Sequence, residues 1–233
     1  MITALGIIIG ILLLLFLIYA SGNIRSGVYV KTISRLPADE KILALTFDDG
    51  PHPEITPLIL AVLKKYNIQA TFFCIGKNIE KNKSVAYRII NDGYLIGNHT
   101  YNHLFAFPFY SSKRMKTEID DCWNQIISIG SPDSPRLFRP PFGITNPTLR
   151  KALKNSGYSV IGWNIRSLDT IIKNPEAVVR RVNKRIKPGS ILLFHDSKAH
   201  TPEIIERVII FALEKGYAFV RADDYLKIMN YKL

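Results

Sequence analysis

Two adjacent carboxylates follow an uncharged, apolar run in the first quarter of the chain. Residues 42–47 read Ile-Leu-Ala-Leu-Thr-Phe, which is typical of a buried β-strand, and Asp48 and Asp49 come directly after it. Gly50 and Pro51 then turn the chain. Two neighbouring like charges beside an apolar strand are costly unless a proton or a cation lies between them. The pair therefore suggests a metal site, and the alternative is a solvated Asp-Gly-Pro turn.

A His-x-x-x-His pair, His99 and His103, offers further metal ligands. If this segment forms one helical turn, the two imidazoles share a face and can bind one cation. One aspartate from the first strand would complete a two-histidine, one-carboxylate set, which leaves a position open for water as a catalytic zinc requires. Two exposed histidines without a metal are the alternative. No role is predicted for His52 or His200.

An arginine opens the rigid turn Arg-Pro-Pro-Phe-Gly. Arg139 either caps carbonyl groups of a structural loop or pairs with one of the two aspartates, lowering its pKa. Pro140 and Pro141 have no N–H, so the first free backbone donor after Arg139 belongs to Phe142. That N–H could face a developing oxyanion.

A third histidine, His195, ends another apolar run. It is either a core histidine bonded to a carbonyl or a general acid that faces a polarised carbonyl group. Asp169 could orient it and raise its pKa, as the third member of a catalytic triad does.

Strand-like and helix-like patterns alternate from residue 41 onward, which favours a parallel α/β sheet or barrel. The candidate residues all fall at the carboxyl ends of predicted strands, which share one face of such a barrel. No Gly-x-Gly-x-x-Gly follows the first strand, so a dinucleotide-binding fold is not expected. The predicted strands are residues 42–47, 70–75, 94–97, 137–139, 159–163, 190–194 and 218–220; the predicted helices are residues 55–66, 84–91, 113–129, 147–155, 176–186 and 202–214.

Composition narrows the class of protein. The 233 residues are 47% hydrophobic, enough for one domain, here residues 38–233. A net charge of +12 suggests an anionic partner such as phospholipid headgroups or a cell-wall polymer. No basic block is interleaved with aromatic residues, so no nucleic-acid partner is expected. The cysteines form no Cys-x-x-Cys, and Cys74 reads as a buried small hydrophobe.

The N-terminus reads as a membrane anchor. Residues 2–20 are almost wholly apolar and just long enough to cross a bilayer, and residues 21–37 read as a polar linker. A signal peptide cleaved after Ala20 or Gly22 is the alternative, but no Lys or Arg precedes the span. Arg25, Lys31 and Arg35 follow it, which by the positive-inside rule favours a cytoplasmic domain.

In order and spacing, these motifs resemble those of the polysaccharide deacetylases, family 4 of the carbohydrate esterases, with their nodulation-type deacetylase domain. The resemblance covers residues 41–224 and rests on Thr46-Phe47-Asp48-Asp49-Gly50-Pro51, His99-x-x-x-His103, Arg139-Pro140-Pro141-Phe142-Gly143, Asp169 and Leu193-Phe194-His195. It implies a distorted (β/α) barrel with about seven parallel strands, preceded here by one transmembrane helix.

The resemblance also implies roles. Asp49, His99 and His103 would bind a divalent metal, usually zinc. Asp48, tuned by Arg139, would be the general base, and the Phe142 N–H would hold the oxyanion. His195, tuned by Asp169, would protonate the departing amine.

The fourth motif departs from the family pattern. It usually reads Asp-x-x-Asp-Trp, whereas Arg166 and Thr170 stand here in place of the first Asp and the Trp. The missing Trp is expected to remove one wall of the sugar groove. Phe142 replaces the usual Tyr of the third motif.

The sequence thus predicts a membrane-anchored, metal-dependent hydrolase that removes N-acetyl groups from the cell-wall sugars of peptidoglycan. Its domain is expected outside the cell, or secreted after cleavage. Another N-acetylated glycan such as a chitooligosaccharide is the alternative substrate, and a catalytically degenerate wall-binding protein is the alternative class. A glycosidase fits less well, because its carboxyl groups must flank one bond at about 5 Å or more and need no metal.

Overall fold

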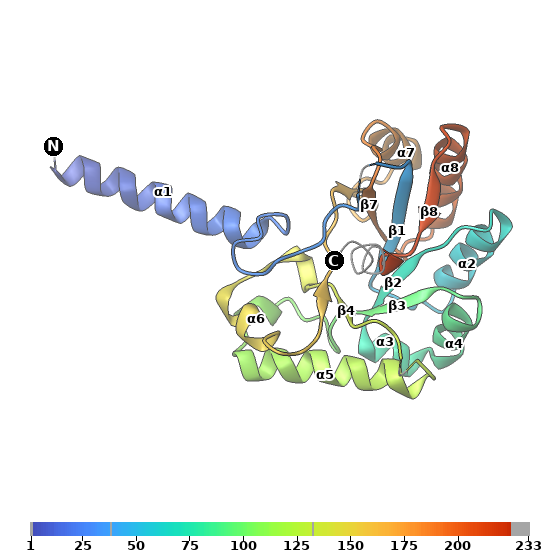
Figure 1. Ribbon diagram of the computed structural model, residues 1–233, viewed down its shortest axis with the longest axis horizontal. Helices are drawn as coiled ribbons and strands as arrows, with labels where there is room; N and C mark the ends of the chain where they lie inside the picture. Colours follow the sequence, from blue (N-terminus) through green and yellow to red (C-terminus); the bar gives the residue numbers. More distant parts are fainter. Residues whose placement is uncertain (1, 38, 132, 225–233) are drawn as a thin grey trace.

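The computed structural model describes residues 2–37, 39–131 and 133–224 (Figure 1). Within them, parallel strands form one curved sheet in the order β5-β4-β3-β2-β1-β7-β6, and β8 pairs with β1 off this path. The strands are β1 (Ile42–Asp48), β2 (Thr71–Cys74), β3 (Leu95–Asn98), β4 (Leu137–Phe138), β5 (Ser159–Val160), β6 (Ile165–Arg166), β7 (Ser190–His195) and β8 (Ala218–Val220).

The first strand is the centre of the sheet. One edge of β1 pairs along nearly its whole length with β7, from Leu43 opposite Ser190 to Asp48 opposite His195. The other edge pairs with β8 through its first residues and with β2 through its last. This uncharged strand is buried after its first residue, as expected for a strand covered on both faces. Asp48 therefore emerges from the interior at the carboxyl end of the sheet.

Helices lie around the outside of the sheet (Figure 1). In α2 the apolar residues Ile55, Ile59, Leu60 and Leu63 recur at helical spacing and are buried against the main core. The described helices after the N-terminal one are α2 (Ile55–Lys65), α3 (Gly76–Lys81), α4 (Lys83–Asn91), α5 (Ser112–Ser128), α6 (Pro147–Ala152), α7 (Pro175–Asn183) and α8 (Thr201–Glu214), with 3₁₀ turns η1 (Phe107–Phe109) and η2 (Pro141–Gly143).

The predicted architecture is confirmed, with differences in detail. All seven predicted strands are present, although β4 and β5 are shorter than expected. The short strand β6 was not predicted, because two residues carry no readable period and only pairing with β7 makes them a strand. Helix α3 was also missed, since six residues are too few for an amphipathic pattern.

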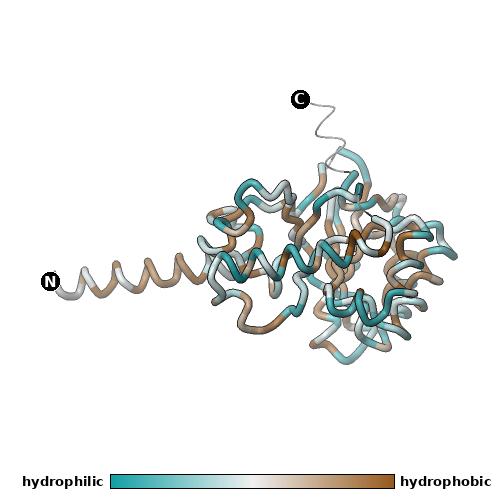
Figure 2. Tube along the Cα trace, turned by 90° about the horizontal axis from the view of Figure 1, so that it is seen from below, coloured by the Kyte–Doolittle hydropathy of each residue, from teal (hydrophilic) through white to brown (hydrophobic). Residues whose placement is uncertain are grey.

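The N-terminal helix α1 (Ile2–Gly22) projects away from the barrel, and its apolar character stands out in Figure 2. It is long and apolar enough to cross a membrane, and a signal sequence would look the same. Side chains from Leu5 to Tyr19 are exposed, whereas Ala20 at the end of the helix is buried.

The segment after α1 packs against the domain. Ile24 and Leu36 are buried, and the N–H of Ile33 donates to the carbonyl of Val160. The N–H of Thr145 donates to the carbonyl of Ser21. The end of the apolar helix is therefore attached next to η2.

Candidate metal centre and catalytic pocket

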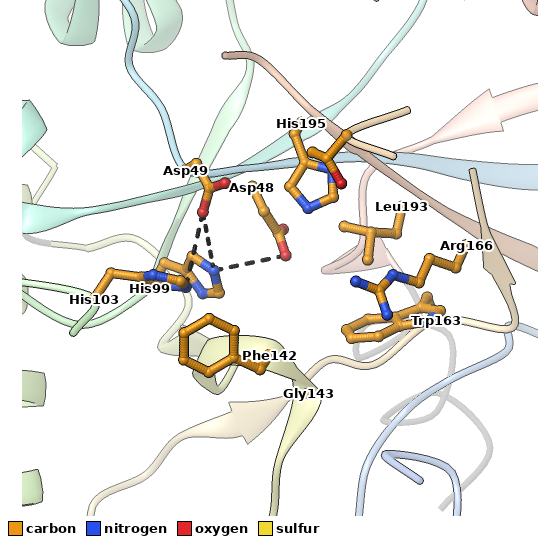
Figure 3. A pocket seen from close by; sticks show the side chains of 11 residues that line it. Asp48, Asp49, His99, His103, Phe142, Gly143, Trp163, Arg166, Leu193 and His195 are labelled. Atoms are coloured by element: carbon orange, nitrogen blue, oxygen red, sulfur yellow. Dashed lines mark ion pairs between the residues drawn. The ribbon is translucent and has the colours of Figure 1, made fainter. Parts of the chain in front are cut away.

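Six of the eight predicted site residues line one pocket of about 200 Å³ at the carboxyl end of the sheet (Figure 3). The other two, Arg139 and Asp169, do not line it but bond to Asp48 and His195. Asp48 and Asp49 come from the end of β1, the histidine pair follows β3, and His195 ends β7. The lining residues are Asp48, Asp49, His99, His103, Phe142, Gly143, Trp163, Arg166, Thr170, Leu193 and His195.

Three side chains offer a set of ligand atoms that fits a divalent metal. Asp49 Oδ1 lies 3.7 Å from His99 Nε2 and 3.8 Å from His103 Nε2, and the three ligand atoms lie within 4.8 Å of one another. Ligand atoms of a tetrahedral zinc lie roughly 3.4 Å apart, given bonds of about 2.0–2.1 Å. Small side-chain shifts would therefore bring the set to bonding geometry.

His99 is oriented for metal binding by a bond on its far side. Its Nδ1 lies 2.7 Å from the carbonyl oxygen of Arg139, and a carbonyl can only accept, so the proton is on Nδ1. The Nε2 lone pair therefore faces Asp49. Burial and the charge of neighbouring His103 hold the pKa of His99 well below its usual value, which keeps the ring neutral as a metal ligand must be.

The histidine segment is a loop, so the helical turn expected from His-x-x-x-His is wrong. His103 has a φ of 53° and Thr100 a φ of 65°, in the left-handed region that a helix of L-residues does not adopt. The rings still meet, with centroids 4.5 Å apart. The carboxylate of Glu118 accepts hydrogen bonds from the backbone N–H and the side-chain amide of Asn102. These bonds stabilise the loop conformation.

Asp48 pairs with Arg139, as predicted. Arg139 Nη1 donates to Asp48 Oδ1 at 2.6 Å and to Thr46 Oγ1 at 2.9 Å. Its remaining donors reach the carbonyl oxygens of Ile161 and Gly162, so this fully buried guanidinium is fixed on all sides. The second oxygen of Asp48, Oδ2, is left facing His99 Nε2 at 3.7 Å.

Arg139 lowers the pKa of Asp48, as predicted, but it does not decide the direction of the net shift. Burial raises the pKa of Asp48, and the charge and hydrogen bond of Arg139 offset this only in part. The sequence indicates that Arg139 is the partner of Asp48, but it does not show how deeply the Asp48 carboxyl group is buried.

Asp169 holds His195 at two points. Its Oδ1 lies 2.8 Å from His195 Nδ1, and its Oδ2 accepts from the His195 backbone N–H at 2.8 Å. Burial alone would lower the pKa of His195, but the hydrogen bond and charge of Asp169 outweigh it and raise that pKa. Burial likewise would raise the pKa of Asp169, yet the contacts with His195 hold it below its usual value. Nδ1 therefore donates to a carboxylate, and Nε2 has no hydrogen-bond partner among the described residues, which leaves it for a substrate.

Phe142 has a φ of 60°, which turns its backbone out of the 3₁₀ geometry of its neighbours. Among the described residues no oxygen accepts a hydrogen bond from its N–H. Its half-exposed ring packs against His103 at a centroid distance of 4.9 Å and against Phe105. Gly143 follows with a φ of 71°, and a Cβ there would lie 2.4 Å from the Trp163 ring. Only glycine permits this close approach.

The sequence analysis assigned no role to Trp163, His200 or His52, of which only Trp163 lines the pocket. Trp163 lines it despite the absence of a Trp from the fourth motif, so an aromatic wall is present after all. His200 Nε2 donates to the carbonyl of Asp169 and so supports the loop that positions His195. His52 Nδ1 accepts from backbone N–H groups at the start of α2 and lies outside the catalytic pocket. No local pattern marks the roles of Trp163 and His200, because each depends on residues that are distant along the chain.

Comparisons with known proteins agree with this geometry. The family model of polysaccharide deacetylases matches residues 35–161. A peptidoglycan-N-acetylglucosamine deacetylase of Bacillus cereus is 35% identical over 82% of this chain and 91% of its own. A peptidoglycan-N-acetylmuramic acid deacetylase of Bacillus subtilis is 29% identical over 80% of this chain and 72% of its own. The structure of a family 4 carbohydrate esterase pseudoenzyme from Bacillus anthracis superposes with a TM-score of 0.78, at 27% identity, over 84% of this chain and 69% of that one.

Proposed function

Since this chain belongs to the polysaccharide deacetylase family, the family 4 carbohydrate esterases, we propose that it is a metal-dependent enzyme that hydrolyses N-acetyl groups of peptidoglycan amino sugars. One observation carries this proposal: the ligand atoms of Asp49, His99 and His103 lie close together in the pocket. Beside them are two ion pairs, Asp48 with the buried Arg139 and His195 with the buried Asp169. The pocket therefore offers a base and an acid beside a metal site.

Asp49, His99 and His103 would hold the metal, and their nitrogen and carboxylate donors suit zinc. A divalent ion bound there would supply Lewis acidity, lowering the pKa of a water molecule and polarising the acetamide carbonyl. Side-chain and backbone groups of the protein would carry out the proton transfers and stabilise the oxyanion.

Asp48 is proposed as the general base. Arg139 occupies Oδ1, so Oδ2 is the oxygen available to take a proton from the attacking water. The arginine also fixes the rotamer of Asp48, because a guanidinium with four acceptors cannot move without breaking several bonds.

His195 is proposed as the general acid. The raised pKa keeps it protonated closer to neutral pH, and Asp169 directs Nε2 away from the carboxylate and into the pocket. Nε2 would donate its proton to the departing amine, releasing acetate and a free amino sugar. The N–H of Phe142 would donate to the oxygen that becomes negatively charged during attack.

Helix α1 is proposed as an uncleaved membrane anchor with the catalytic domain outside the cell, where peptidoglycan lies. The length and exposed apolar surface of α1 support this. Arg25, Lys31 and Arg35 point to the opposite orientation, but three charges near a span weigh little against the translocation of a whole domain. Protease treatment of intact cells should degrade the domain; full protection would place it in the cytoplasm, and release into the medium would indicate cleavage.

Acetate release tests the activity directly. Full-length protein in detergent, loaded with zinc, should release acetate from peptidoglycan fragments, lose this activity with a chelator and regain it when zinc is returned. Chitooligosaccharides in parallel would identify the alternative substrate. New reducing ends without acetate would instead indicate a glycosidase.

A wall-binding protein without activity is the second candidate, supported by the altered fourth motif and by the pseudoenzyme among the structural neighbours. The intact Asp48–Arg139 and Asp169–His195 pairs argue against it. Absence of acetate release with zinc, cobalt and manganese, together with binding to insoluble peptidoglycan, would favour this candidate.

A further inference from the structure

A second cavity, of about 320 Å³, adjoins the catalytic pocket, and Phe142, Trp163 and Arg166 line both. Four arginines line this arginine cavity and, among the described residues, no acidic side chain does. Its lining residues are Gly22, Asn23, Ile24, Arg25, Phe142, Trp163, Asn164, Arg166, Arg181 and Arg185.

Three of these arginines are joined to one another through the backbone rather than to acids. Arg181 Nε donates to the carbonyl of Arg166 at 3.2 Å, and Arg185 Nη1 donates to the carbonyl of Arg181 at 3.0 Å. Within the described chain, none of the four side chains forms an ion pair with Asp or Glu. Slight burial, together with the charges of Arg185 and Arg166, lowers the pKa of Arg181. The cluster is therefore a concentration of uncompensated positive charge.

Such a cluster suits an anionic oxygen group. A guanidinium presents a planar fork of donors that matches carboxylate or phosphate oxygens. Arg166 stands where the family's fourth motif carries an aspartate, so the departure from the motif reverses the charge at the rim of the pocket. In Figure 3, Arg166 lies on the same side of the pocket as Trp163, whose indole offers a surface for a sugar ring.

We propose that the arginine cavity binds a carboxylate of the glycan whose acetyl group occupies the catalytic pocket, such as the lactyl or peptide carboxylate of a muramic acid residue. The inference rests on the proposed deacetylase function. The shared wall of Phe142, Trp163 and Arg166 favours a group on the substrate over a lipid headgroup, since one ligand can reach both cavities. The cavity would thereby select anionic peptidoglycan over neutral chitin-type glycans.

A matched pair of substrates tests this. Muramic acid-containing fragments with free carboxylates and the same fragments as methyl esters differ in the charge of each carboxyl group and in one added methyl group. The measured quantity is the ratio of kcat/KM for the acid to that for the ester, with zinc-loaded, full-length protein. We expect the R181Q/R185Q double variant to lower this ratio about ten- to a hundredfold, through KM, as loss of charge-assisted hydrogen bonds predicts.

Arg180→Gln is the control, because Arg180 is exposed on the same helix and does not line the cavity. It should leave the ratio unchanged. An equal ratio in the wild type and the double variant would overturn the inference while the deacetylase function stands. Wild-type protein that releases no acetate from either substrate would instead refute the proposed function.

Binding provides a measurement independent of turnover. Calorimetry with de-N-acetylated fragments should show tighter binding of the free acid than of the ester to the wild type, and this difference should be lost in the double variant. Flotation with phosphatidylglycerol or phosphatidylcholine vesicles, using protein released from detergent, tests the lipid alternative. The inference would be overturned if the double variant lost its preference for phosphatidylglycerol vesicles but still bound the free acid more tightly than the ester. The cavity would then be a lipid site.

Discussion

The Nδ1 atom of His99 lies 2.7 Å from the carbonyl oxygen of Arg139, which joins the candidate metal site to the arginine that holds the candidate base. The two residues follow neighbouring strands, and the Arg139 N–H in turn donates to the carbonyl of Asn98. One backbone segment therefore sets the tautomer of the metal ligand and the position of Asp48. Variants of this site should separate metal binding from proton transfer.

His99→Ala removes one ligand, whereas Asp48→Asn keeps all three. We expect the His99→Ala protein to lose bound zinc and activity together. Asp48→Asn should retain the metal, with kcat lower by about 10²- to 10⁴-fold, since an amide cannot accept the proton. Elemental analysis and acetate release on the same preparations check both. Zinc loss in Asp48→Asn would place that residue among the ligands instead.

Asp169→Asn should shift the pH dependence of the reaction. Asp169 raises the pKa of His195, so its neutral replacement lowers that pKa, and the histidine loses its proton at lower pH. The basic limb of the kcat/KM profile should therefore move to lower pH. If the kcat/KM values fall but the basic limb of the profile stays at the same pH, Asp169 positions His195 without changing its pKa.

Arg139→Met should destabilise the fold in a pH-dependent way. Removing one partner of a buried pair costs about 3–5 kcal/mol. Without the guanidinium the pKa of Asp48 rises further, so the unfolded chain loses its proton before the folded one does. Stability should therefore fall as the pH rises above the normal aspartate pKa. Denaturant unfolding of chelated protein at pH 5 and pH 8 checks this, with Lys65→Gln in the exposed Lys65–Glu206 pair as a nearly silent control.

Asp196→Asn should stabilise the protein relative to the wild type as the pH increases. Asp196 is fully buried, and burial raises its pKa to about 7 although Thr56 Oγ1 donates to it. Between the unfolded pKa of 3.8 and about 7 the folded carboxyl keeps its proton while the unfolded one ionises, so the wild type loses stability as the pH rises.

An amide does not ionise, so the Asp196→Asn variant should gain about 3 kcal/mol on the wild type between pH 5 and pH 8 in chelated protein. Unfolding free energies of the two proteins at both pH values measure the difference. A constant difference would show that Asp196 ionises normally in the fold.

The sequence by itself determined the parallel α/β architecture and the positions of the polar residues at strand ends. Both follow from short-range information. An uncharged run such as residues 42–47 can only be buried, and parallel strands must present their carboxyl ends on one face. The contacts of Arg139 with Asp48 and of Asp169 with His195 were predictable from charge once that face was assumed.

The tertiary structure alone decided how the loops between those elements run. The left-handed residues Thr100 and His103 depend on Glu118, a partner in α5, so no local pattern distinguishes this loop from a helical turn. The arginine cavity likewise brings Arg25 next to Arg166 and Arg181, which lie far from it along the chain. Short-range preferences fix which residues form strands and helices, whereas burial, pKa and the grouping of distant charges depend on how these elements pack, and packing is a property of the whole chain.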